Sequence, residues 1–184
     1  MEPLPHADAL HVKAAQGWLD LNNSLEAADE LAKIAPESRL HPDALEVQWK
    51  VLAAGMKWEA SLSVADAIIK VAPQRASGWI MKSLALRGLD RIQEAFDVLF
   101  PIVNNFPHVP AIAYDLACCS CRLGRLDEAV GWLEKACKAD GKGRFEEMAL
   151  SDLDLKPLWP KLRQGRSDTR RLGGSALAKP ASET

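Results

Sequence analysis

Apolar side chains recur along this chain with the spacing of an α-helix that has one buried face. The pattern is most regular between residues 110 and 141, where small or apolar residues twice occupy positions i, i+3, i+4 and i+7. They are Ala113, Leu116, Ala117 and Ser120 in the first run and Ala129, Trp132, Leu133 and Ala136 in the second. This spacing places each run on one face of a helix. Gly124 separates the runs, and Asp127 suits the start of a helix, so the pattern predicts two antiparallel helices joined by a short turn.

The same two-helix pattern occurs four times at a nearly constant period. Glu-Ala pairs stand at 26–27, 59–60, 94–95 and 128–129, so the numbers of successive alanines differ by 33, 35 and 34. Helix-breaking dipeptides follow in the same phase at 35–36, 72–73, 106–107 and 140–141. Two markers that share one period predict four helix pairs. We place them at about residues 7–37, 42–74, 76–108 and 110–141.

These residues resemble the tetratricopeptide repeat (TPR) family, whose helix-turn-helix unit is about 34 residues long. The resemblance covers roughly residues 6–140 and is clearest from Tyr114, through the segment 124–129, to Ala136. It departs from the family pattern at Lys82, where an apolar residue is usual. The resemblance implies an all-α fold, a right-handed superhelical solenoid of antiparallel helix pairs.

Stacked repeats expose an apolar face at each end of the array and need a cap with a polar outer side. Residues 143–163 offer apolar side chains for such a cap, namely Phe145, Met148, Ala149, Leu155, Leu158 and Trp159. Asp154 would cap a short final helix that has Pro157 in its first turn. We therefore expect residues 1–163 to form one repeat domain with C-terminal capping helices. Residues 164–184 have no amphipathic period and are expected to form a flexible tail.

Composition and charge exclude several classes of protein. Apolar residues make up 48% and charged residues 26% of the chain, with a formal net charge of −2. A dedicated nucleic-acid binder would normally be strongly basic. The apolar stretches are too short to span a bilayer, and the N-terminus shows no secretory signal. We expect a cytoplasmic protein with no nucleic-acid or membrane partner.

In the TPR family, ligands usually bind on the concave surface formed by the first helix of each pair. A stripe at i, i+4 and i+7 on each first helix, distinct from the core stripe, predicts the lining of this groove: Val12, Gln16 and Leu19; Leu45, Trp49 and Leu52; Ile80, Leu84 and Arg87; Tyr114, Cys118 and Cys121. These side chains are mostly apolar, so the family's Lys, Arg and Asn clamp for acidic chaperone tails is not expected.

An apolar groove suits an amphipathic helix or an extended peptide of a protein partner, or a segment of the chain itself. The sequence therefore favours a protein-protein interaction module or adaptor. In the alternative, the stripe packs internally, between neighbouring units or against the terminal helices. A self-associating scaffold, including a homodimer, is also compatible with the pattern.

The cysteines raise a further alternative. Cys118 and Cys121 share a helix face, and Cys137 lies on the partner helix of the same unit. Three thiolates would suit zinc or Cu(I), or would respond to an oxidant. Small buried cysteines that fill alanine-like positions are more common, however. The sequence assigns no metal and no cofactor.

No catalytic motif is present. The chain has no Gly-rich phosphate loop, no H-E-x-x-H and no G-x-S-x-G. Its histidines stand at the N-terminus or near predicted loops: His6, His11, His41 and His108. A Cys-His nucleophile would need a third orienting group, and the sequence offers none. We expect a protein that is not an enzyme.

Overall fold

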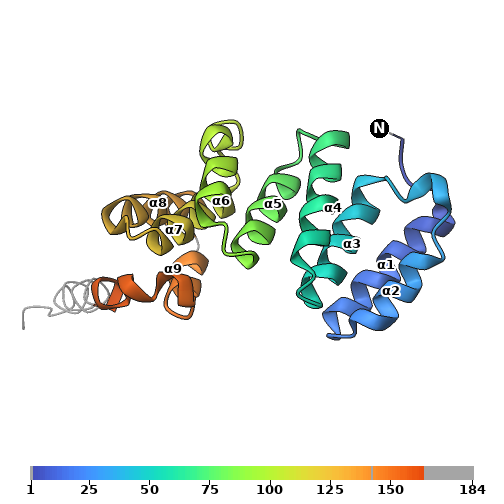
Figure 1. The fold of residues 1–184 in the computed structure, drawn as a ribbon, viewed down its shortest axis with the longest axis horizontal. Coiled ribbons are helices and arrows are strands. Elements are labelled where there is room, and N and C mark those ends of the chain that lie inside the picture. The colour runs from blue at the N-terminus through green and yellow to red at the C-terminus, as the bar shows by residue number, and fades with distance from the viewer. Residues whose placement is uncertain (1, 142, 164–184) are drawn as a thin grey trace, which may run out of the picture.

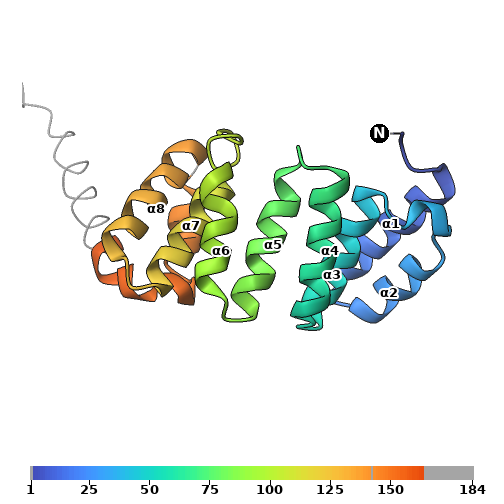
Figure 2. The ribbon, with the colours of Figure 1, turned by 45° about the horizontal axis from the view of Figure 1, so that its top comes forward.

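The computed structural model describes residues 2–141 and 143–163, and this part of the chain contains helices and no β-strand. The tail predicted for residues 164–184 lies outside the described residues. Four helix pairs follow one another: α1 (His6–Asp20) and α2 (Ser24–Ala32), α3 (Pro42–Ala54) and α4 (Trp58–Val71), α5 (Ala76–Gly88) and α6 (Ile92–Leu99), α7 (Pro110–Arg122) and α8 (Leu126–Asp140). Figures 1 and 2 show them in chain order along the long axis of the molecule. The predicted all-α solenoid of helix pairs is confirmed.

Each helix pair turns back through one residue in the left-handed backbone conformation. These residues are Asn22 (φ 58°), Met56 (φ 53°), Asp90 (φ 62°) and Gly124 (φ 76°), and their numbers rise by a constant 34. The residue that follows donates its backbone N–H into the preceding helix, as from Arg125 to the Ser120 carbonyl at 2.9 Å. This bond satisfies a carbonyl that the helix end would otherwise leave unpaired. The repeat period is thus regular in the turns, although their side chains differ.

The second unit is shifted by one residue from the sequence interpretation. Near the start of each second helix stands one small, fully buried residue, and these four follow the same constant step as the turns: Ala27, Ser61, Ala95 and Ala129. The Glu-Ala pattern put Ala60 at this position, but Ala60 is exposed. Ser61 is accommodated because its hydroxyl donates a 3.0 Å hydrogen bond to the Lys57 carbonyl. The residues on the first helix of this unit shift with it.

The core consists of four clusters, of which the first three each join one helix pair to the next first helix. These three connect α1 and α2 to α3, α3 and α4 to α5, and α5 and α6 to α7. First helices also pack directly on one another, α1 on α3, α3 on α5 and α5 on α7, more closely than second helices do. Because the first helices approach more closely, the solenoid curves toward them, and they form its concave side.

The third pair ends early at a proline. Helix α6 stops at Leu99 and continues as a 3-10 turn, η2 (Phe100–Ile102), because Pro101 has no N–H for the α-helical bond. Another 3-10 turn, η1 (Pro36–Ser38), follows α2. The shortened helices leave longer connections before α3 and α7.

The C-terminal segment, residues 144–163, completes the last core cluster where a further first helix would otherwise pack. It contains α9 (Arg144–Ala149) and the 3-10 helix η3 (Leu153–Leu158), and Figure 1 shows it folded back below α7 and α8. Its buried side chains are Phe145, Ala149, Leu155 and Leu158. Three details differ from expectation. Pro157 lies inside η3 and not in its first turn. Met148 is 49% exposed, and Asp152 caps η3 in place of Asp154, because its carboxylate accepts the Asp154 N–H at 3.0 Å.

Candidate functional site

The concave side carries two hollows, one between the first two units and one that extends from the second unit to the fourth. The first, of about 550 Å³, lies between α1 and α3 and is lined by Pro3, Leu4, Ala9, Val12, Lys13, Gln16, Asp43, Glu46, Val47 and Lys50. The second, of about 390 Å³, lies between α3, α5 and the C-terminal segment and is lined by Trp49, Trp58, Leu84, Arg87, Gly88, Arg122 and Asp154. We consider the two hollows together as the candidate binding surface.

The stripe predicted on α1 lies partly in the first hollow. Val12 and Gln16 line it, whereas Leu19 packs against the first core cluster. The Gln16 side-chain amide donates to Asp20 at 2.8 Å and its oxygen accepts from the Lys50 ammonium at 2.6 Å. Gln16 therefore joins the first and second units through a polar contact.

The stripe predicted on α3 lies mostly away from the concave surface. Leu45 and Trp49 are 3% and 7% exposed and belong to the core between α3, α4 and α5, although Trp49 also borders the second hollow. Leu52 lines a separate apolar cleft of about 360 Å³ with Leu31 and Val51. The cause is the one-residue shift of the second unit.

Charged residues that the sequence reasoning missed stand on the concave side of α3. Glu46 accepts hydrogen bonds from the Ser77 hydroxyl at 2.6 Å and from the Arg75 guanidinium at 3.3 Å. Arg75 also pairs with Asp43 at 2.5 Å. Together with Lys50, these side chains make the first half of the surface polar, where the sequence predicted an apolar groove. A constant step from Val12 and Gln16, equal to the one between the turns, leads to Glu46 and Lys50, so a strict period would have found them.

The stripe on α5 lies nearest to the second hollow. Leu84 lines that hollow and is half-buried, and Ile80 packs against the core between α5, α6 and α7. Arg87 extends from α5 to α7 and to the C-terminal segment. Its guanidinium pairs with Asp115 at 3.0 Å and with Asp154.

The stripe on α7 is covered by the C-terminal segment. Tyr114, Cys118 and Cys121 are all at most 5% exposed and share a core cluster with Leu155 and Leu158. The Tyr114 hydroxyl donates a 2.9 Å hydrogen bond to Asp152, and the Cys118 thiol lies 3.6 Å from the same carboxylate. At the fourth unit, the chain itself therefore occupies the predicted groove.

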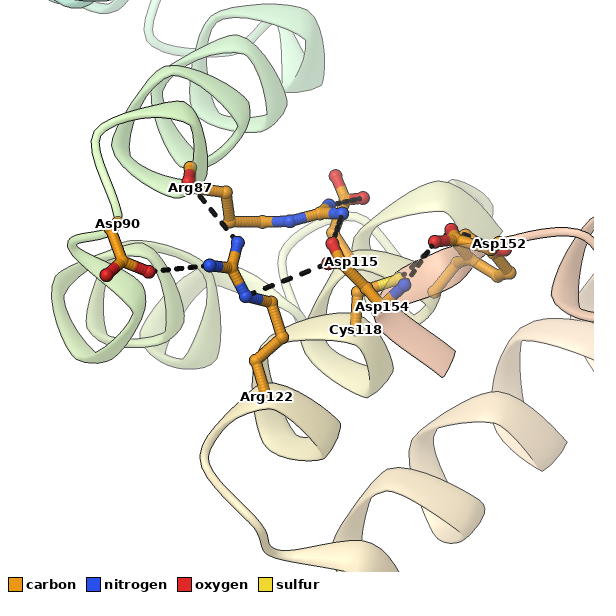
Figure 3. Close-up of polar contacts among 8 residues, drawn as sticks. Arg87, Asp90, Asp115, Cys118, Arg122, Asp152 and Asp154 are labelled. Carbon is orange, nitrogen blue, oxygen red and sulfur yellow. Dashed lines mark hydrogen bonds and ion pairs between the residues drawn. The ribbon is translucent and has the colours of Figure 1, made fainter. Parts of the chain in front are cut away.

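A network of ion pairs ties this segment to two first helices (Figure 3). Arg122 on α7 pairs with Asp90 at 2.6 Å and with Asp154 at 3.7 Å, and it donates to the Arg87 carbonyl at 3.3 Å. Asp154 is thus held between two guanidinium groups. Charge-assisted contacts of this kind are stronger and more directional than neutral hydrogen bonds.

Burial sets the electrostatics around this network. It raises the pKa of Asp115 to about 6, although Arg87 acts in the opposite direction. Burial also raises the pKa of Tyr114, and the Cys118 thiol and Asp152 add to that effect. Tyr114 is thereby kept neutral as a hydrogen-bond donor to Asp152.

The thiol and metal alternatives are not supported. Burial raises the pKa of all four cysteines, that of Cys119 to about 11, so little reactive thiolate forms near neutral pH. Among the described residues, the cluster of possible metal ligands within 4.8 Å of one another is Cys118, Asp152 and Asp154, and it does not unite Cys118, Cys121 and Cys137. Arg87 already supplies the positive charge next to Asp154.

Two of the histidines have structural contacts. His11 lies 2.8 Å from Glu30, which also pairs with Lys33 at 2.7 Å. His41 caps α3 by accepting the Asp43 N–H at 3.2 Å. Within the described part of the chain, neither side chain is hydrogen-bonded to a cysteine or hydroxyl nucleophile.

Membrane insertion gains no support from the helices. None of those in residues 2–141 and 143–163 has the length and apolar character needed to cross a bilayer.

Similarity to known proteins is found in structure and not in sequence. No protein-family model matches the chain, and no curated protein sequence resembles it significantly. Residues 41 to the end of MamA from Desulfovibrio magneticus RS-1 superpose with a TM-score of 0.67 at 17% identity, over 96% of this chain and 100% of that one. A thermophilic TPR protein of Thermus thermophilus gives 0.68 at 20% identity, over 87% and 83%. PilF of Pseudomonas aeruginosa gives 0.72 at 16% identity, over 96% and 78%. At these identities the similarity concerns the fold alone.

Proposed function

We propose that this chain, which has the fold of tetratricopeptide repeat proteins, is a non-catalytic interaction module that holds a peptide or helix of a protein partner on its concave side. The observation that carries the proposal is the pair of hollows on the concave side, which the chain's own side chains leave open. Stacked repeats present such extended concave surfaces because each unit contacts only its neighbours. A partner segment laid along α1, α3 and α5 would touch both hollows.

The chemistry of the surface indicates what such a segment would present. The first hollow offers paired charges and an amide, with Lys13, Gln16 and Lys50 as donors and Asp43 and Glu46 as acceptors. The second offers aromatic and aliphatic walls from Trp49, Trp58 and Leu84. A partner with one apolar anchor residue for the second hollow and polar groups for the first would match both, because a buried apolar anchor usually supplies most of the binding energy.

A pair of charge reversals tests this function. Lys50→Glu changes the concave surface, and Lys70→Glu makes the same change on the exposed side of α4. Proteins captured from a cell extract by the full chain are quantified by mass spectrometry for the wild type and both variants. We expect Lys50→Glu to reduce recovery of a specific partner by about tenfold, the effect of losing one important contact, and Lys70→Glu to leave it unchanged.

A second variant tests whether the partner binds mainly in the second hollow, where Lys50→Glu would have little effect. Leu84→Glu puts a charge among Trp49, Trp58 and Leu84. Circular dichroism of each variant shows whether the helices are retained. If all correctly folded variants recovered the same proteins in the same amounts, the concave side would not be the binding surface.

A further inference from the structure

The C-terminal segment lies on the concave surface of α7 through a short pattern of acidic and leucine residues. Asp152 accepts from the Tyr114 hydroxyl, Asp154 pairs with two arginines, and Leu155 and Leu158 are 0% and 1% exposed. Leu153, between the two aspartates, is 75% exposed and contributes nothing to the contact. The pattern that is recognised is therefore Asp-x-Asp-Leu-x-x-Leu.

The groups that receive this pattern belong to the repeats and not to the segment. Arg87 comes from α5 and Arg122 from α7 (Figure 3). Tyr114 also comes from α7. These first helices form the concave side, the same surface that carries the open hollows farther along. The guanidinium groups of Arg87 and Arg122 both pair with Asp154, which gives charge complementarity at that carboxylate. The Tyr114 hydroxyl donates to Asp152, and the leucines cover the apolar stripe of α7. We call Arg87, Tyr114 and Arg122 the acidic-segment seat.

We infer that the acidic-segment seat recognises a linear segment of a partner protein with the pattern Asp-x-Asp-Leu-x-x-Leu, and that residues 152–158 are a tethered occupant which this partner segment displaces. The inference rests on the proposed function and names the class of partner. It differs from a fixed structural cap in requiring that the segment leave the seat while the four helix pairs stay folded.

Exchange of one segment for another is energetically feasible. An incoming segment with the same pattern would replace each contact that residues 152–158 give up, so only the advantage of the tether must be overcome. A tethered ligand acts at an effective concentration in the millimolar range. The second hollow adjoins Asp154 and is left unfilled by the tethered segment, so a partner that also enters it gains contacts that residues 152–158 lack.

The test uses the full chain and a fluorescent synthetic peptide of residues 150–160. A matched peptide carries asparagine in place of both Asp152 and Asp154. The variant Asp154→Asn weakens the tethered occupant without touching the seat. We expect it to bind the wild-type peptide at least about tenfold more tightly than the wild-type chain does, because the internal competitor is weaker. The asparagine peptide should bind neither chain, and adding Arg122→Gln to the Asp154→Asn variant should abolish binding.

Hydrogen exchange of the unmodified chain gives a second test that needs no variant. Amides of residues 152–158 should exchange faster than those in the middle of α7 and α8, and saturating peptide should accelerate them further. If the amides of residues 152–158 exchanged hydrogen only at the rate of the α7 amides, the inference would be overturned. Equal binding of the two peptides would also overturn it. A dimer of the Asp154→Asn variant that the peptide does not dissociate would assign the seat to a second copy and also overturn it. Loss of extract partners in Lys50→Glu would still support the proposed function in each of these cases.

Discussion

Gly88, the last residue of α5, is required by the close approach of a neighbouring ring. A Cβ atom at this position would overlap the indole ring of Trp58, the first residue of α4. Gly131 in α8 provides a contrast, because no atom from elsewhere in the described chain lies within 4 Å of the place where its Cβ would be. The same residue type is therefore needed for packing at one position and only weakens the helix at the other.

Replacing these two glycines with alanine should have opposite effects. Gly88→Ala should lower the free energy of unfolding by about 1–3 kcal/mol, because the indole must shift out of its packed position. Gly131→Ala should raise it by up to about 1 kcal/mol, because alanine is the better helix former. Urea denaturation of both variants measures the difference. Equal stability of Gly88→Ala and the wild type would show that the Trp58 ring does not have a fixed position.

Asp115 makes stability depend on pH through its burial. Its pKa of about 6 lies above the ordinary value of 3.8, so the folded state holds the proton more tightly than the unfolded state does. Stability should therefore rise as the pH falls from 7 to 5, by ~1 kcal/mol according to the linkage relation. Asp8, Glu30 and Glu94 have lowered pKa values, so their stabilisation is lost only at more acidic pH.

The measurement is urea denaturation at pH 7 and pH 5 for the wild type and for Asp115→Asn. The variant cannot take up the proton and should lack the gain, while any contribution from other groups remains in both proteins. The same gain in both proteins would show that Asp115 is not its source.

The four turns between paired helices place different residues in one backbone conformation. Left-handed φ values are costly for most side chains, and glycine adopts them freely. Only the turn of the fourth unit has glycine at this position, Gly124, whereas the second has Met56, which is 74% exposed. The second turn is therefore strained in a way that no packing contact of the methionine side chain offsets.

Met56→Gly should accordingly raise the free energy of unfolding by about 0.5–1 kcal/mol, since it removes the left-handed penalty and loses almost no buried surface. Gly124→Ala should lower it by a similar amount. Thermal melting followed by circular dichroism compares the two variants with the wild type. A less stable Met56→Gly protein would mean that the methionine side chain contributes a contact that outweighs the strain.

The C-terminal segment matters to the molecule as a whole because it ends the array. Its leucines join the same core cluster as α7 and α8, in the place where a fifth unit would pack. The array would otherwise expose an apolar face at this end. The segment also covers the concave side at the fourth unit and leaves the two hollows open.

Two leucine variants test the packing of this segment against the repeats. Leu155→Ala removes a fully buried side chain and should lower the free energy of unfolding by about 2–5 kcal/mol. Leu153→Ala changes a side chain that is 75% exposed and should alter it by less than about 0.5 kcal/mol. Urea denaturation of the full chain measures both. Similar losses in the two variants would contradict the observed packing of the segment.

The candidate site was only partly predictable. Val12, Gln16, Trp49, Leu84 and Arg87 were predicted and do line the two hollows, although Trp49 is mostly buried in the core. The residues of the second unit were misplaced because the Glu-Ala pair there is one residue out of phase. A register error of one residue turns a helix by about 100°. It therefore exchanged the core residues Leu45 and Trp49 for the concave residues Glu46 and Lys50.

The chain's own sequence determines the helices, their pairing and their repetition, because these depend on local periodicity and on turns within a single unit. Which surface stays open depends on contacts between residues far apart in the chain. The sequence around Arg87 does not indicate that its side chain pairs with Asp154, 67 positions later. The apolar stripe of α7 is likewise compatible with either an external peptide or residues 152–158. The sequence pattern does not distinguish these two occupants, because both would pair with the same charges and bury the same apolar surface. The tertiary structure shows that residues 152–158 lie there.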